Sequence, residues 1–274
     1  MQKDKFKALW VSHSSIGDFL KCPRLYYFRN IYKDPLSGHK ITLMNPPLAL
    51  GQAVHDTIES LSRIPCSERF RTDLEKKFAQ SWQKVTGKKG GFKSKEEESR
   101  EYERGIEMIR KIKSNPGPLL NKAIKIKSQL PWYWLSLEEE IILCGKIDWI
   151  EYNEETNNVH IIDFKTGRVE EDDNSLQLPI YLLLASNTQK RAVEKASYWY
   201  LERNDSPTTM KLPDIASSYD AVYKEAKRIK LARQLEHFKC PKGGCKYCTP
   251  IEHVANGKGE LVGLSEYNQD IYIL

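Results

Sequence analysis

GKIDWIE (residues 145–151) and HIIDFKTG (residues 160–167) are the two stretches that decide the fold of this chain. The first contains Asp148, and the second contains Asp163 and Lys165, two residues apart. Because strand side chains alternate between two faces, Asp163 and Lys165 are predicted to point to the same face. The apolar residues around them are typical of a strand that is buried on both faces.

These three side chains suggest a catalytic metal site. A carboxylate and an amine within an apolar strand need partners, since an unpaired buried charge is costly. Two carboxylates on neighbouring strands offer hard oxygen ligands that suit Mg²⁺ or Mn²⁺. A lysine beside the metal can help to deprotonate water or stabilise charge on a phosphate. A purely structural ion pair is the alternative, which the G-x-x-D pattern ending at Asp148 makes less attractive.

Extended and helical segments succeed one another along the chain and predict an α/β fold. Periodicity and turn residues predict strands at 139–143, 146–152, 159–165 and 196–202. Helices are predicted up to about residue 32 and at 49–62, 67–85, 96–113, 176–185 and 219–238, with Pro46 and Pro47 as a break. We expect one domain over 1–274, with a helical part (1–130), a catalytic core (131–210) and a C-terminal part (211–274).

Composition narrows the class of protein. The 274 residues are 40% hydrophobic and 29% charged, which can support a packed core, and the net charge of +6 permits a nucleic-acid partner without requiring one. No run approaches ~18 apolar residues, and the N-terminus lacks a signal-peptide pattern. We therefore expect a cytoplasmic protein with no membrane span, whose six cysteines are free or metal-bound.

The order of several motifs resembles the RecB-like branch of the PD-(D/E)XK nucleases, which includes AddB nuclease domains and the CRISPR adaptation nucleases. The resemblance extends from Ser12 to Cys248. SHSSIGDFLKCPRLYYF is similar to the opening helix of that branch, and LALGQAVHDTIE to the helix with a metal-binding histidine. The two stretches quoted above are similar to its catalytic strands, and QLPIY to its Gln-x-x-x-Tyr motif.

This resemblance implies a restriction-endonuclease-like core, in which helices flank a short mixed β-sheet, with an N-terminal helical elaboration and a C-terminal cysteine-rich segment. The metal ligands that it implies are His55, Asp148, Asp163 and the carbonyl of Phe164. The catalytic residues that it implies are Lys165, Asp148, Asp163, Gln177 and Tyr181. Taken alone, His55 would be a core histidine, and Gln177 and Tyr181 would share one helix face because they are four residues apart.

Four of the cysteines form a second candidate site. Cys22 and the pair Cys245-x-x-Cys248 match positions that hold an iron–sulfur cluster in some members of the branch. The last cysteine of that pattern is absent, and Cys240 lies upstream instead. The resemblance therefore implies a 4Fe-4S cluster on Cys22, Cys240, Cys245 and Cys248. Zinc on the C-terminal cysteines with His237 or His253, or reduced cysteines without metal, remain alternatives.

The sequence thus predicts a metal-dependent deoxyribonuclease, in particular an exonuclease, acting in DNA repair, recombination, or phage- or CRISPR-related DNA processing. The expected substrate is DNA that is single-stranded or has a free end. The expected partner is a helicase or a CRISPR adaptation protein, since the chain has no P-loop of its own. The alternative is a catalytically silent DNA-binding or scaffold protein, against which the complete His–Asp–Asp–Lys set argues.

Overall fold

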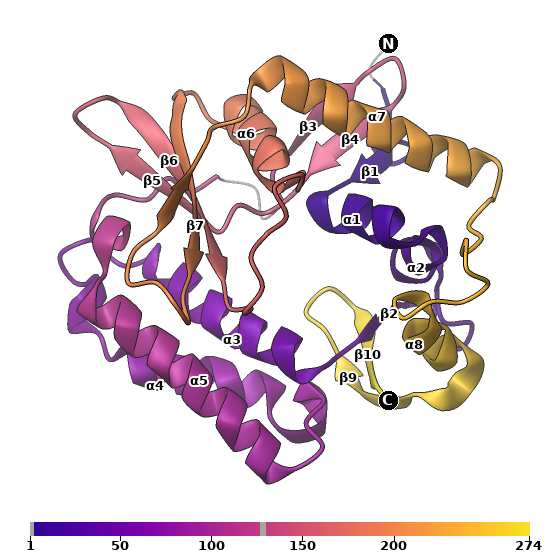
Figure 1. The fold of residues 1–274 in the computed structure, drawn as a ribbon, viewed down its shortest axis with the longest axis horizontal. Coiled ribbons are helices and arrows are strands. Elements are labelled where there is room, and N and C mark those ends of the chain that lie inside the picture. The colour runs from indigo at the N-terminus through magenta and orange to yellow at the C-terminus, as the bar shows by residue number, and fades with distance from the viewer. Residues whose placement is uncertain (1–2, 127–129) are drawn as a thin grey trace.

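Three small β-sheets and the helices around them make up the computed structural model, which describes residues 3–126 and 130–274 (Figure 1). The main sheet has the strand order β5-β6-β7-β8. Its strands are β5 (Trp149–Asn153), β6 (Asn158–Lys165), β7 (Val193–Tyr200) and β8 (Thr208–Met210). Strand β6 pairs antiparallel with β5 and parallel with β7, so the sheet is mixed, as expected.

Two further sheets join segments that are far apart in the sequence. The second sheet has the order β1-β4-β3, from β1 (Leu9–Val11), β4 (Ile141–Cys144) and β3 (Trp132–Ser136). The third has the order β2-β10-β9, from β2 (Lys40–Leu43), β10 (Gln269–Ile273) and β9 (Glu260–Leu264). Strand β10 pairs in parallel with β2, which leads into helix α3, so the C-terminal hairpin is attached to the N-terminal half.

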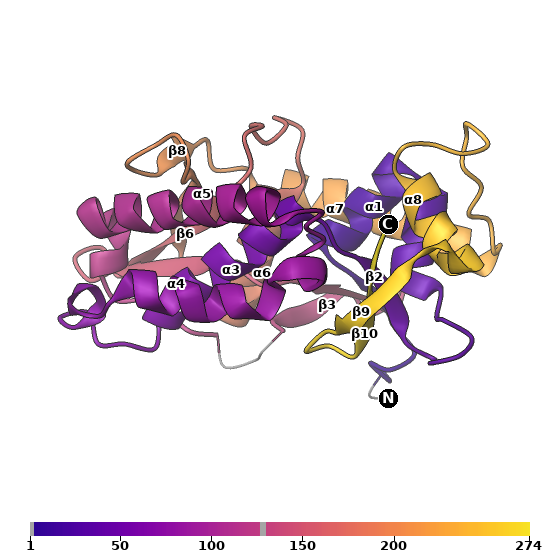
Figure 2. The same ribbon diagram turned by 90° about the horizontal axis from the view of Figure 1, so that it is seen from below.

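Helices cover both faces of the main sheet (Figures 1 and 2). One face packs against α3 (Pro46–Leu61), α4 (Leu74–Trp82) and α5 (Lys95–Ser114). The other packs against α1 (His13–Lys21), α6 (Gln177–Thr188) and α7 (Ile215–Gln234). Two shorter helices, α2 (Pro23–Tyr26) and α8 (Cys248–His253), lie with the cysteine-rich segment.

Strand β6 is buried on both faces, which confirms the prediction from its apolar sequence. Ile162 and Phe164 pack into the core beneath α3, whereas Ile161 packs into the core beneath α6. Asp163 has the same parity as Ile161, and only 2% of it is exposed. The catalytic strand therefore directs Asp163 and Lys165 towards α6 and away from α3.

Proline positions explain two differences between the predicted and observed helices. The opening helix ends at Lys21, because Cys22 is extended before Pro23, and a new helix starts at that proline. Pro46 and Pro47 do not break the chain but form the first turn of α3, where a proline loses no helical hydrogen bond. Asn45 caps this helix by accepting a hydrogen bond from the Leu48 amide.

The three strands predicted at 139–143, 146–152 and 159–165 do not all belong to one sheet. Strand β4 belongs to the second sheet, and β5 starts only at Trp149. Asp148 therefore lies just before the strand, where its side chain accepts the Phe164 N–H at 3.0 Å. A side-chain acceptor thus replaces a ladder bond at this point, and strand alternation no longer fixes where Asp148 points.

Two other segments also differ from the prediction. The segment predicted as one helix at 67–85 contains a 3-10 turn (Arg69–Arg71) before α4, which Asp73 caps. In the C-terminal part, where no strand was predicted, β9 and β10 form a hairpin.

Gly105 allows α5 to approach α4 closely, beside the helix that carries His55. A Cβ atom added there would lie 2.2 Å from Cζ of Phe78, which is fully buried. We expect Gly105→Ala to lower the free energy of unfolding by about 1–3 kcal/mol, because the core must shift to admit the methyl group. Gly17→Ala in α1 is the control: nothing lies within 4 Å of its added Cβ, so stability should rise by about 0.5–1 kcal/mol. Urea unfolding measures both changes, and equal effects would contradict the packing explanation.

Candidate active site

The end of β6 meets the start of α6, and this junction brings four of the predicted residues together. Gln177 donates from Nε2 to Asp163 Oδ1 at 2.6 Å, and the Tyr181 hydroxyl donates to the same oxygen at 3.1 Å. The Lys165 ammonium donates to Gln177 Oε1. It also lies 3.0 Å from Asp163 Oδ2. Gln177 and Tyr181 therefore hold the Asp163–Lys165 pair and do not form an exposed helix surface.

Asp148 and His55 form the other half of the site. His55 Nδ1, on α3, lies 3.4 Å from Asp148 Oδ2. Asp148 is itself held by the Phe164 amide, so both halves are attached to β6 within three residues of one another. All the predicted catalytic and metal-binding side chains thus surround the end of one strand; the role of the Phe164 carbonyl stays a prediction.

The electrostatics of the group follow from burial and from like charges. Burial raises the pKa of Asp163, and the neighbouring Asp148 raises it further, to about 7. Burial alone would lower the pKa of His55, but the Asp148 carboxylate raises it to about 9. Burial also opposes ionisation of Asp148, yet the His55 cation holds the pKa of Asp148 below its ordinary value. Perturbed groups of this kind are concentrated at functional sites.

A divalent cation fits this donor set. Carboxylates and an imidazole are suitable ligands for Mg²⁺ or Mn²⁺. Asp163 Oδ2 is buried and, among the described residues, receives no well-directed hydrogen bond, although Lys165 is close. A buried carboxylate oxygen without a donor is a costly group that a metal ion would satisfy.

Three residues near the site were missed in the sequence. Glu59 groups with His55 and Asp148, with one ligand atom of each within 4.8 Å of the others. Its position four residues after His55 on the same helix was a signal that could have identified it. Glu171 Oε2 lies 3.0 Å from the Lys165 ammonium. Burial lowers the pKa of the nearby His13, while the charge of Glu171 raises this pKa and that of Lys165 lowers it. Glu171 comes from the loop after β6, for which no periodicity exists.

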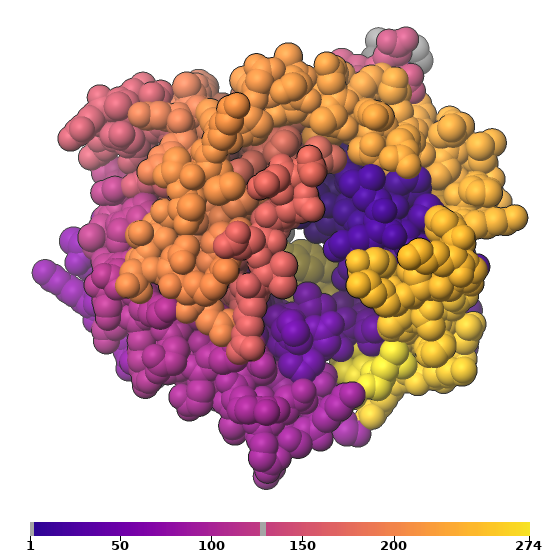
Figure 3. Space-filling view, viewed as in Figure 1, coloured from indigo at the N-terminus to yellow at the C-terminus, as the bar shows by residue number. Residues whose placement is uncertain are grey.

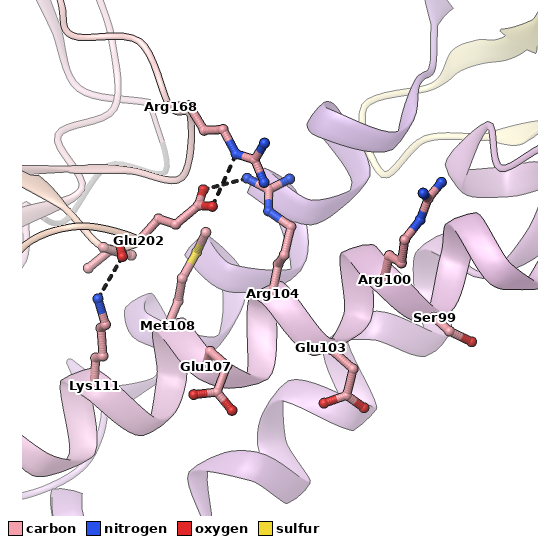
Figure 4. A pocket seen from close by; sticks show the side chains of 10 residues that line it. Ser99, Arg100, Glu103, Arg104, Glu107, Met108, Lys111, Arg168 and Glu202 are labelled. Atoms are coloured by element: carbon pink, nitrogen blue, oxygen red, sulfur yellow. Dashed lines mark hydrogen bonds and ion pairs between the residues drawn. The ribbon is translucent and has the colours of Figure 1, made fainter.

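A cavity of about 610 Å³ lies beside α5 and is separate from this group (Figure 4). Glu202 occupies one end, where it accepts hydrogen bonds from Arg104 at 2.6 Å and Arg168 at 3.1 Å. Lys111 donates to the Glu202 carbonyl at 2.6 Å. The cavity contains none of the predicted site residues, and three of its cations already have an acceptor.

The second candidate site also assembles. Ligand atoms of Cys22, Cys240, Cys245 and Cys248 all lie within 4.8 Å of one another. The backbone N–H of Cys248 and that of Tyr247 lower the pKa of Cys245 to about 6. All six cysteines are free thiols, as expected. The structure therefore confirms that Cys240 joins the other three, and a metal could bind here.

Comparison with known families agrees with this geometry. Residues 10–251 match the model of the PD-(D/E)XK nuclease superfamily, whose members use divalent metals. No curated protein matches the chain significantly. Because the family match covers most of the length of the chain, the chain belongs to the PD-(D/E)XK nuclease superfamily.

Among the residues that the structure describes, no helix combines the length and the apolar character that a membrane span needs.

Proposed function

We propose that this member of the PD-(D/E)XK nuclease superfamily is a divalent-metal-dependent DNA exonuclease that acts on strands with a free end. The observation that supports it best is the convergence of His55, Asp148, Asp163 and Lys165 at the end of β6. A catalytically silent relative would have no need to keep the buried Asp163 beside Asp148, because the repulsion between the two carboxylates is costly.

Each residue of the group has a role that follows from its contacts. His55, Glu59 and Asp148, whose ligand atoms lie within 4.8 Å of one another, would hold a divalent cation, with Asp163 as a further ligand beside them. When bound, such a cation polarises the phosphate and makes water a better nucleophile. The Lys165 ammonium stabilises negative charge on the phosphate oxygens during attack. Gln177 fixes the relative positions of the Lys165 and Asp163 side chains, since it donates to the carboxylate and accepts from the amine.

The surface around the group offers a path by which DNA can reach the site. Figure 3 shows a hollow bordered by the segment after β6, by α1, by α3 and by the C-terminal segment. His55 belongs to α3 and Glu171 to the segment after β6, so two of these borders carry residues of the site. We propose that a DNA end reaches Lys165 through this hollow, delivered by a helicase or a CRISPR adaptation partner.

Digestion of matched linear and circular single-stranded DNA tests this function. With Mn²⁺, we expect end-labelled linear DNA to be shortened progressively and the circle to stay intact, and a chelator should stop all cleavage. Cleavage of the circle would show endonuclease activity and contradict the proposed need for an end. DNA binding without cleavage of either substrate, with Mn²⁺ or Mg²⁺, would favour the silent scaffold.

A further inference from the structure

The four-cysteine group contains thiols from three separate parts of the chain. Cys22 caps the end of α1, Cys240 follows α7, and Cys245 and Cys248 precede and begin α8. Cys22 and Cys248 are almost fully buried, at 2% and 0% exposure. Four converging thiols that form no disulfide are suited to a metal, since thiolates are strong ligands of soft and borderline ions.

The distances between the sulfurs decide what fits among them. Every pair lies within 4.8 Å, and the Cys245 and Cys248 sulfurs are 3.6 Å apart. A tetrahedral zinc ion with Zn–S bonds of ~2.3 Å needs sulfurs ~3.8 Å apart. Even a regular tetrahedron with edges of 4.8 Å has its centre only about 2.9 Å from each corner. The observed group thus needs little contraction to bind one ion.

An iron–sulfur cluster fits this arrangement poorly. It spreads its cysteine ligands over two or four irons bridged by sulfide, so thiolates on different irons are farther apart than thiolates on one ion. The spacing of Cys240, Cys245 and Cys248, C-x4-C-x2-C, lies within the zinc-site range but also occurs in ferredoxins. The spacing alone therefore does not distinguish the two, whereas the close approach of all four sulfurs does.

We propose that Cys22, Cys240, Cys245 and Cys248 bind a single structural zinc ion and not an iron–sulfur cluster. Four thiolates complete the tetrahedron, so no position is open for substrate, which is the pattern of structural zinc sites. Neither His237 nor His253 belongs to the group of ligand atoms, so a Cys₃His site is not favoured. The ion joins α1 and α2 to α8, and the β9–β10 hairpin that follows α8 pairs with the strand before α3.

Metal analysis of protein purified without oxygen tests this assignment, independently of any nuclease activity. We expect one zinc per chain and no stoichiometric iron or acid-labile sulfide. Chelator-treated protein titrated with Co²⁺ should develop the visible bands of a tetrahedral tetrathiolate complex, and Zn²⁺ should abolish them. Stoichiometric iron with sulfide would overturn the proposal, as would protein that contains neither metal and gives no cobalt bands.

Cysteine variants identify the ligands. Cys22→Ser and Cys240→Ser should each lose most of the bound zinc and unfold at lower temperature, because metal binding is coupled to folding. Cys66→Ser is the matched control, since Cys66 lies outside the group. This variant should keep one zinc per chain. If the Cys22 variant does not fold, the metal content and cobalt spectrum of the unmodified protein still decide. Zinc retained in a folded Cys22→Ser variant would overturn the four-cysteine assignment.

Discussion

Replacing Lys165 with alanine is expected to reduce the rate of DNA cleavage by about 10²–10³-fold, while DNA still binds. The Lys165 ammonium is held by Gln177 and lies 3.0 Å from both Asp163 and Glu171. Its position is therefore fixed before a substrate arrives, so it can stabilise charge on the phosphate without reorganisation. Alanine removes this cation but leaves the ligands His55 and Asp148 in place.

Single-turnover cleavage of end-labelled single-stranded DNA gives the rate, and Mn²⁺ titration by calorimetry reports whether the metal site survives. Lys195→Ala is the control, because Lys195 is an exposed lysine on the adjacent strand β7. This variant should cleave DNA at the normal rate. Cleavage by the Lys165 variant at the unmodified rate would leave Lys165 as a structural ion-pair partner of Asp163. If the variant loses both cleavage and Mn²⁺ binding, Lys165 is needed to maintain the structure of the metal site, and its role in the chemical step is not supported.

The sequence predicted which side chains lie together at the end of β6 better than it predicted the sheets around them. Alternation along β6 predicted that Asp163 and Lys165 share a face, and the observed contact between them confirms this. Helical spacing predicted that Gln177 and Tyr181 share one helix face, and both donate to one oxygen of Asp163. Such local periodicities survive in the fold because a strand or helix fixes the relative directions of residues two or four apart.

Long-range pairing could not be predicted in the same way. Nothing local in Ile141–Cys144 indicates that it pairs with Leu9–Val11 and not with the strand that follows it. The β9–β10 hairpin was missed because its strands contain few buried residues, so the apolar alternation is weak. Glu171 was missed for a related reason: a loop has no periodicity, and its contact with Lys165 exists only in three dimensions.

The affinity for Mn²⁺ is expected to rise steeply with pH, because two predicted ligands carry protons in the metal-free protein. The pKa of His55 is raised to about 9 by the Asp148 carboxylate, and that of Asp163 to about 7, chiefly by burial. A metal binds the deprotonated forms and must displace these protons. Affinity should therefore change about tenfold per pH unit between about pH 7 and 9, and about a hundredfold per unit below pH 7.

The stability of the metal-free protein should change in the opposite direction. The raised pKa of His55 stabilises the folded state below the unfolded pKa of 6.5, and this contribution is lost as pH rises through about 9. The raised pKa of Asp163 acts in the same sense, because the unfolded carboxyl ionises near 3.8 while the folded one stays neutral until about 7. Thermal unfolding should thus show the metal-free protein losing stability as pH rises, and the gain on adding Mn²⁺ becoming larger.

Calorimetry in buffers of different ionisation enthalpy counts the protons released when Mn²⁺ binds. We expect about one proton per ion near pH 8 and about two near pH 6. His55→Ala should weaken binding and abolish the proton release near pH 8, since the displaced proton belongs to His55. His39→Ala is the matched control, because His39 also pairs with a carboxylate, Asp270 at 2.9 Å, but lies outside the metal-binding group. Equal proton release by His55→Ala and the unmodified protein near pH 8 would mean that His55 is a core histidine and that the cation is bound by carboxylates alone.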